Sequence, residues 1–333
     1  GKVVMAKTSS SSVHALGGAS TITAGTLQLG GTGNDQLWSG STVTVNASAN
    51  AAFDLNGRTE EMSSLSLRGS GISSAGALLN SAASTTSTLT CSGGITLAGT
   101  TYIGGAGNIT LPSVISGAQV LVKVGAGTLT LSGTAANTYS GSYTEVREGV
   151  VVLDKTDNIT AIANNVTIGD GSGNDEELTL NSHNQIADTS VLTINGVGDG
   201  SGNNGKFNLN GYDETVGGIS STKADAIIQH SENGAATTST LTVNNSADCA
   251  YAGTIRNRTG GSGILKLVKS GDATLTLSGN NNLYAGGTTV SAGTLLVNNT
   301  SGSGTGSGTV TVNGGILGGS GLISGAVTVN SGG

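Results

Sequence analysis

The sequence of 333 residues has almost no proline and few aromatic or charged residues. It contains one proline, two cysteines, one tryptophan, six tyrosines and two phenylalanines, and 10% of its residues are charged. A single proline excludes a collagen-like chain, which needs proline together with glycine at every third position. Two cysteines are too few for a disulfide framework. The low charge and the 35% of apolar residues do not fit the composition of a disordered chain.

The sequence also lacks the features of nucleic-acid-binding and membrane-spanning proteins. Its formal net charge is −7, so it offers no basic field to neutralise phosphates, and we expect no nucleic-acid partner. It contains no apolar run of about 18 residues, so we expect no transmembrane segment. Residues 1–7 lack an initiating Met and the apolar core of a signal peptide. We therefore expect a mature or excised part of a longer chain.

Glycine and small polar residues dominate the composition. Gly, Ser, Thr and Asn make up 173 of the 333 residues, and Gly costs about 1 kcal/mol per helical position, which argues against a helical fold. Apolar residues alternate with small polar ones in short runs, for example at 42–46, 128–132, 240–244 and 309–313. A period of two with β-branched residues is typical of half-buried strands, and Gly, Asn and Asp between the runs favour turns. We predict an all-β chain.

Internal repeats indicate how these strands are organised. Leu129–Gly133 returns as Leu275–Gly279, and Thr85–Thr90 returns as Thr237–Thr242, in the same order along the chain. The repeats predict one continuous β-solenoid over residues 1–333. Its expected parts are the end of a preceding copy at 1–25, copies at 26–149 and 150–293, and the start of a following copy at 294–333.

A ladder of short strands can close as a sandwich, a propeller or a parallel β-helix. Copies of unequal length favour the helix, because each coil contacts only its neighbours and tolerates insertions in its turns. The single proline fits too, since nearly every backbone N–H must donate to the next coil. With roughly 20 to 25 residues per coil and strands about 4.8 Å apart, we predict a parallel β-helix of roughly 15 short rungs.

The aligned copies predict the surroundings of the two cysteines. Cys91 stands where Val243 stands in the other copy, and Cys249 stands where Ile95 stands. Both replace aliphatic residues of the inward face. We therefore interpret the cysteines as small buried residues without a redox or disulfide role.

Two further residue types recur at matching positions. Lys123 and Lys269 each precede a glycine by two residues, and we interpret them as exposed lysines at strand ends that discourage further sheet pairing. Tyr139 and Tyr284 occupy the same repeat position. This match suggests that the two tyrosines pack at a corner.

The residues around these positions resemble the autotransporter-associated β-strand repeat. The clearer copy covers 269–279, 282–290 and 293–297, and the weaker copy covers 123–133, 138–141 and 146–149. Such repeats occur in passenger regions of surface and secreted proteins of Gram-negative bacteria, typically as right-handed parallel β-helices. The resemblance implies export and an extracellular or cell-surface location. It does not imply one particular activity.

One local motif resembles a calcium site. Residues 30–38 fit the nine-residue repeat of a calcium-binding β-roll, with Asp35 as the carboxylate ligand. That site needs tandem copies because successive turns share each ion, and the nearest relatives, at 171–175 and 198–204, are distant and imperfect. A plain turn is the favoured interpretation. Asp35 is the one candidate metal ligand, and we expect no other cofactor.

Candidate catalytic residues are sparse. The histidines, His14, His183 and His230, form no metal-ligand pair at short spacing. The carboxylates lie beside turn residues without a matched pair inside a strand, which predicts solvated turns rather than a glycosidase-like pair. They are Glu60, Glu61, Asp157, Asp175, Glu176, Glu177, Asp213 and Glu214. We expect no catalytic residues and no enzymatic activity.

These observations favour an extracellular structural segment that acts as a surface stalk, fibre or adhesive spacer, within a longer repetitive chain or a filament. We expect neighbouring copies to cover its open sheet edges end to end. One alternative is a module that binds glycans or host surfaces, since Trp38 and the tyrosines can stack on sugars. A less favoured alternative is a polysaccharide-active β-helix enzyme, which needs paired carboxylates on adjacent rungs.

Overall fold

Short parallel strands form nearly all of the regular secondary structure. The computed structural model describes residues 1–8, 13–171, 176–196, 205–230, 237–257 and 262–333. In these residues the only helix is one 3-10 turn, η1, at Ile72–Ser74, so none is long and apolar enough to cross a membrane. The chain divides into two compact units, Gly1–Ala163 and Asn164–Gly333.

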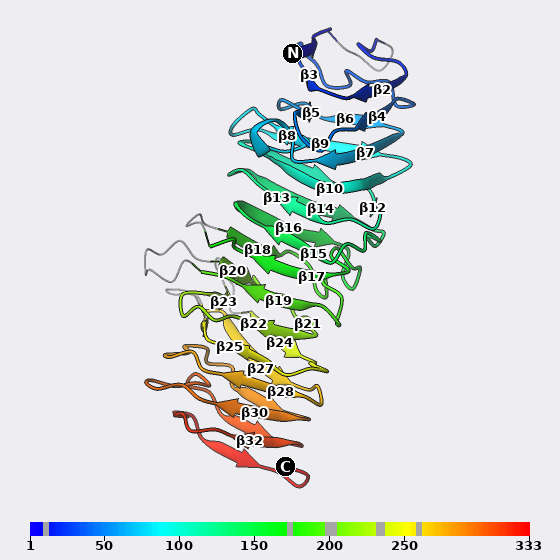
Figure 1. Cartoon of the computed structure of the whole chain (residues 1–333). Coiled ribbons are helices and arrows are strands. Elements are labelled where there is room, and N and C mark those ends of the chain that lie inside the picture. Colours follow the sequence, from blue (N-terminus) through cyan, green and yellow to red (C-terminus); the bar gives the residue numbers. More distant parts are fainter. Residues whose placement is uncertain (9–12, 172–175, 197–204, 231–236, 258–261) are drawn as a thin grey trace. The chain divides into compact units, whose positions relative to one another are not determined.

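The described residues of the first unit form sixteen strands, coloured blue to green in Figure 1. They are β1 Lys2–Met5, β2 Ala19–Ile22, β3 Gly25–Leu29, β4 Thr42–Val45, β5 Ala51–Asp54, β6 Glu60–Met62, β7 Ser64–Gly69, β8 Leu78–Asn80, β9 Thr86–Cys91, β10 Ile95–Gly105, β11 Asn108–Leu111, β12 Ile115–Ser116, β13 Leu121–Lys123, β14 Thr128–Gly133, β15 Tyr143–Val146 and β16 Gly149–Lys155. Strands β1, β3, β5, β8, β10, β13 and β15 pair in that order, and β6, β9, β11, β14 and β16 form a second ladder.

The second unit repeats this arrangement. Its strands are β17 Asn165–Ile168, β18 Glu176–Leu180, β19 Val191–Ile194, β20 Gly205–Asn208, β21 Glu214–Val216, β22 Gly218–Ser220, β23 Ile227–Gln229, β24 Thr238–Val243, β25 Cys249–Tyr251, β26 Thr254–Arg256, β27 Ile264–Lys269, β28 Thr274–Leu277, β29 Thr288–Val290, β30 Thr294–Val297, β31 Val310–Val312, β32 Ile316–Gly318 and β33 Val327–Val329. One ladder runs β21-β24-β27-β29-β31-β33, and another runs β25-β28-β30-β32.

The predicted alternation appears directly as strand burial. In β14 the side chains of Leu129 and Leu131 are buried, whereas Thr128 and Thr130 are half-buried. Successive side chains of a strand point to opposite faces, so the leucines line the interior and the threonines line the surface. The same pattern holds in β24, where Leu241 and Val243 are buried.

Parallel pairing stacks the inward side chains into columns. Leu27 lies opposite Phe53, Phe53 opposite Leu78, and Leu78 opposite Ile103. Phe53, Leu78 and Ile103 are fully buried. Each coil therefore adds one layer of side chains to a thin core, and such a core needs only the modest apolar fraction of this sequence.

The predicted fold class is confirmed: the chain is all-β, and its parallel sheets form a β-solenoid. The solenoid makes about 12 turns, fewer than the 15 rungs expected, because some coils are longer than assumed. Leu65 of β7, for example, pairs with Ile95 of β10. The division into copies at 26–149 and 150–293 stays a prediction about the sequence repeat.

Candidate functional site: buried polar residues of the repeat

The two matched lysines point into the solenoid. Lys123 ends β13 and Lys269 ends β27, and only 2% and 0% of their surfaces are exposed. In its column Lys123 lies between Ile103 and Val146. The expectation of exposed strand-end lysines is therefore wrong. Alternation places Lys123 on the same face as the buried Leu121.

Backbone carbonyls of two successive coils accept hydrogen bonds from each buried ammonium group. Lys123 Nζ donates to the carbonyl oxygens of Val124 at 2.9 Å and Glu148 at 3.0 Å. Lys269 Nζ donates to the carbonyl oxygens of Gly271 and Ala292. Each lysine thus joins the turn after its own strand to the turn of the next coil.

The surroundings of these ammonium groups are poorly hydrated. Burial lowers the pKa of Lys123 to about 8, and the nearby charge of Glu148 opposes this shift. Burial also lowers the pKa of Lys269. A glycine makes room beside it, because a Cβ at Gly293 would lie 2.7 Å from Lys269 Nζ.

An asparagine in each repeat bridges the coil before it and the coil after it. Asn137 Oδ1 accepts from the backbone N–H of Ile115 at 2.9 Å, and its Nδ2 donates to the carbonyl of Ala161 at 2.9 Å. Asn282 makes the equivalent bonds with the N–H of Ile255 at 2.7 Å and the carbonyl of Gly304 at 2.8 Å. Both asparagines are buried. Each one therefore connects three successive coils.

The matched tyrosines satisfy a threonine that stands in the apolar column. The hydroxyl of Tyr139 lies 2.8 Å from Thr144 Oγ1, and that of Tyr284 lies 2.6 Å from Thr288 Oγ1. All four residues are buried, and burial raises the pKa of both tyrosines. Both tyrosines are therefore packed in the interior of the repeat, and their expected position at a corner stays a prediction.

These features define the class of protein to which the chain belongs, the parallel β-solenoid proteins. The family model of the passenger-associated-transport-repeat matches twice, at residues 121–153 and 267–297. Each match contains one of the buried lysines, the bridging asparagine and the buried tyrosine. These two segments thus match the passenger-associated-transport-repeat, in agreement with the resemblance. No curated protein and no solved structure gave a match.

A second recurring motif places a glutamate inside the solenoid. Glu60 of β6 and Glu214 of β21 are each only 1% exposed. Glu60 accepts from the backbone N–H groups of Gln36 at 2.8 Å and Leu37 at 3.0 Å. Glu214 accepts from those of Gln185 at 2.8 Å and Ile186. Each carboxyl group therefore binds a turn of the preceding coil.

This finding corrects the expectation that Glu60 and Glu214 lie in solvated turns and that no carboxylate recurs as a matched pair inside a strand. Glu60 follows Leu55 by five residues, and Glu214 follows Leu209 by the same spacing. Burial raises the pKa of Glu60, although its two backbone hydrogen bonds oppose the shift. Burial raises the pKa of Glu214 to about 8, although hydrogen bonds from backbone N–H groups oppose this shift too. Alternation could have revealed both, because Glu60 shares a face with Met62 and Glu214 with Val216.

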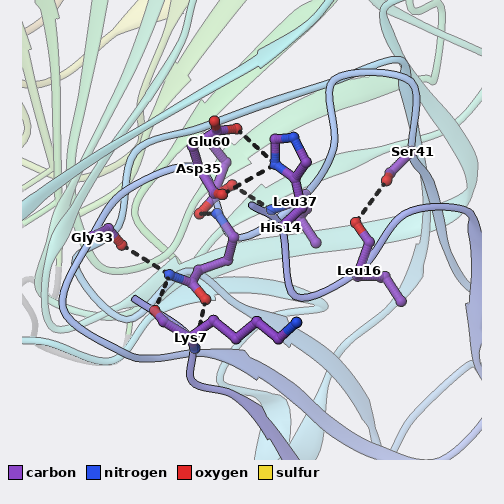
Figure 2. A network of polar contacts seen from close by, with 9 residues as sticks. Lys7, His14, Leu16, Gly33, Asp35, Leu37, Ser41 and Glu60 are labelled. Carbon is purple, nitrogen blue, oxygen red and sulfur yellow. Dashed lines mark hydrogen bonds and ion pairs between the residues drawn. The ribbon is translucent and has the colours of Figure 1, made fainter. Parts of the chain in front are cut away.

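The turn with the predicted calcium ligand is the one whose backbone N–H groups Glu60 binds. Asp35 has a positive φ of 68°, and its carboxylate lies 3.5 Å from Nδ1 of His14. Figure 2 shows His14, Asp35 and Glu60 close together. Among the described residues no group of three His, Cys, Asp or Glu side chains is arranged to hold a metal. Calcium at Asp35 stays a prediction, and residues 172–175 and 198–204 of its relatives lie outside the described residues.

The other histidines take part in separate contacts. His183 Nδ1 accepts from the backbone N–H of Asp213 at 3.0 Å. The ring of His230 is buried, and its Nε2 lies 3.0 Å from Thr237 Oγ1. Both contacts lie within the second unit, and we interpret them as part of its packing.

The two cysteines are free thiols in different surroundings. Cys91 is buried opposite Met62, as predicted, and burial raises its pKa to about 12. Cys249 lies opposite Leu275 but is only half-buried. The prediction of a fully buried residue therefore holds for Cys91 alone. At Cys249 burial also raises the pKa.

Proposed function

We propose that this chain is a non-catalytic structural segment of an extracellular or surface-displayed passenger, in which the solenoid serves as a stalk or spacer. The main support is that both segments matched by the family model contain buried side chains that connect successive coils. Asn137 and Asn282 each bond to the coil before and the coil after. Lys123 and Lys269 add a second connection between neighbouring coils.

These bridges suit a protein that must resist separation of its coils. Parallel strands already bond each coil to the next, and buried side-chain hydrogen bonds are stronger in a low-dielectric interior. Opening one coil exposes a donor and an acceptor that lose their partners together. These hydrogen bonds lie in the interior of the repeat. Salt and water therefore weaken them less than they weaken polar contacts at the surface.

Neighbouring copies are the partners that we propose for the open sheet edge. Strand β33 is the last strand of its ladder, and Val327 and Val329 are 48% and 62% exposed. A strand with exposed valines is a template for further β-pairing. We propose that a further copy of the repeat covers it, within one longer chain or in a filament.

Electron microscopy and force spectroscopy of the purified chain test the stalk role. We expect extended rods, and we expect a chain carrying Asn137→Ala and Asn282→Ala to unfold at lower force than the unmodified chain. Asn280→Ala serves as the control, because Asn280 is exposed and its contacts can be replaced by water. Compact particles, or equal unfolding forces in the two chains, would contradict the proposal.

A further inference from the structure

The turn around Trp38 forms a polar hollow on the surface of the first unit. The hollow has a volume of about 460 Å³, within the range of about 300–1,000 Å³ that is typical of small-molecule sites. Its lining includes His14, Asn34, Asp35, Trp38, Thr59 and Glu61. The buried polar framework described above uses Glu60 from the floor of this hollow. The residues at its rim are not part of that framework.

Trp38 presents a supported aromatic face in this hollow. Trp38 is the only tryptophan of the chain, and it is 48% exposed. A Cβ at Gly40 would lie 2.6 to 2.9 Å from the outer ring carbons of Trp38. One side of the indole therefore rests against Gly40, which only a glycine permits. The indole thus contacts the backbone at Gly40 while about half of the residue remains open to solvent.

The second unit shows that the fold does not need this tryptophan. Its equivalent turn has the same framework, because Glu214 binds the N–H groups of Gln185 and Ile186 as Glu60 binds those of Gln36 and Leu37.

In that turn Ala187 stands where Trp38 stands, and Thr189 stands where Gly40 stands. The turn closes in both units with the same backbone hydrogen bond, from Ser41 to Trp38 and from Ser190 to Ala187. The tryptophan and the glycine beneath it are thus an addition in the first unit that packing does not explain.

The polar groups of the rim determine which ligand chemistry fits. Asp35 and Glu61 bring carboxylates to the hollow, and His14 lies beside Asp35. The backbone N–H of Thr59 binds Asn34 Oδ1, and its carbonyl accepts from the N–H of Asp35, so this part of the rim is held in place. Carboxylates accept hydrogen bonds from hydroxyl and amino groups and repel anions.

We propose that this hollow is a carbohydrate subsite that binds an uncharged or amine-bearing pyranose unit of a glycan. The apolar face of the pyranose ring lies on the indole of Trp38, since flat aromatic rings pack against such C–H surfaces. Its hydroxyl or amino groups donate to Asp35 and Glu61. The two carboxylates exclude uronic and sialic acids. This inference goes beyond the structural role, because the stalk does not depend on the subsite.

The only tryptophan of the chain gives a direct measurement of the subsite. The full chain is titrated with oligomers of N-acetylglucosamine, glucosamine, glucose and galacturonic acid while the tryptophan emission is recorded. We expect a saturable change with at least one of the uncharged or amine-bearing oligomers and none with oligogalacturonate. Calorimetry gives the affinity of variants that lack Trp38 and therefore lack the fluorophore.

Variants separate the subsite from the rest of the surface. We expect Trp38→Ala to weaken binding at least tenfold and Asp35→Asn to weaken it several-fold, with circular dichroism spectra unchanged. Arg68→Ala is the control, since Arg68 lines a different hollow of the first unit with Tyr102 and Gln119.

Absence of saturable binding to every oligomer, a preference for oligogalacturonate, or equal affinity in Trp38→Ala would overturn the proposal. A calcium-dependent emission change that Asp35→Asn abolishes, without sugar binding, would overturn it in favour of a metal site. Electron microscopy tests the stalk role independently of sugar binding. The stalk role can therefore hold when the carbohydrate subsite is disproved, and the reverse is also true.

Discussion

Charged and polar side chains inside this solenoid are compatible with its apolar columns because the turns supply their partners. Lys269 stands in a column between Val243 and Val290. Its ammonium group reaches the carbonyls of two turns at the end of the strand. A buried cation is tolerated where its N–H donors are hydrogen-bonded. If one partner of such a bond is removed, the remaining polar group stays buried without a partner and carries the full desolvation cost.

Lys269→Met tests this pairing. Met has a similar length and is apolar, but it leaves the carbonyls of Gly271 and Ala292 without this donor. We expect the free energy of unfolding to fall by about 2 kcal/mol, measured by urea denaturation. Lys266→Met is the matched control on the same strand, because Lys266 is exposed, and a change within about 0.5 kcal/mol is expected. Equal effects of the two substitutions would show that the buried hydrogen bonds contribute nothing.

Asn282→Ala tests the bridge across three coils. The substitution leaves the N–H of Ile255 and the carbonyl of Gly304 unpaired in a buried position. Each unsatisfied group costs about 1–3 kcal/mol, so we expect a loss of about 2–4 kcal/mol in thermal or denaturant unfolding. Asn280→Ala, two residues earlier and exposed, is expected to change stability little. A loss no larger than that of the control would contradict the bridging role.

At the scale of an element, β6 and β21 each bind a turn of the preceding coil through one carboxyl group. Such a strand needs a residue that accepts two backbone N–H groups and still fits an inward position. Glu214 does so with Gln185 and Ile186. The element therefore carries a titratable group in the core, and its protonation is coupled to folding.

The pH dependence of stability follows from this coupling. Burial raises the pKa of Glu214 from 4.5 to about 8, so between these values the native chain holds a proton that the unfolded chain has lost. Unfolding releases that proton. The contribution of Glu214 to the free energy of unfolding is therefore largest below about pH 4.5 and falls as the pH rises to about 8, by at most about 1.4 kcal/mol per pH unit.

Glu214→Gln keeps a neutral side chain of the same shape and is expected to flatten that slope in denaturation curves recorded from pH 5 to 8. Because burial also raises the pKa of Glu60, the double variant with Glu60→Gln is expected to be flatter still. Glu61→Gln is the control, since Glu61 is exposed on the same strand as Glu60. An unchanged slope in Glu214→Gln would show that another group controls the pH dependence.

The strands were predicted from the sequence, whereas the burial of the polar residues was missed although the alternation contains it. Alternation correctly identified the inward leucines of β14 and the inward face of β24. The same alternation places Lys269 on the face of Leu267 and Glu214 on the face of Val216. General experience that charged residues are exposed outweighed that pattern. The decisive partners, such as Ala292 for Lys269, lie in the turn of the next coil and leave no local mark in the sequence.

The candidate surface site was less accessible to prediction than the core. The motif at 30–38 includes the turn that lines the candidate hollow, and sugar stacking on Trp38 stays a prediction. The role of Gly40 depends on the position of the indole ring, which alternation does not describe. The comparison with Ala187 and Thr189 also needed the structure, because the two turns share only a Gln, an aliphatic residue and the closing Ser.

At the scale of the whole molecule, the outer strand of a solenoid ladder has an unpaired edge, and such an edge can pair with a strand of another copy. Strand β33 pairs with β31 through Val327 and Val329 and has no further strand beside it among the described residues. Its valines would be buried in a continuing ladder, as Val310 and Val312 are in β31. Covering them removes apolar surface from water at about 25 cal/mol per Å².

We therefore expect the chain of 333 residues to self-associate as its concentration rises, in sedimentation velocity experiments at neutral pH. Val327→Lys with Val329→Lys should weaken that association at least tenfold, because each added strand would have to bury two charges. Ile264→Lys is the control, since Ile264 is also an exposed apolar residue but lies on β27, between two paired strands. Association that Ile264→Lys weakens as much would indicate general hydrophobic contact, whereas a chain that stays monomeric at all concentrations would exclude pairing through β33. Selective loss in the double variant would assign the contact between copies to this edge.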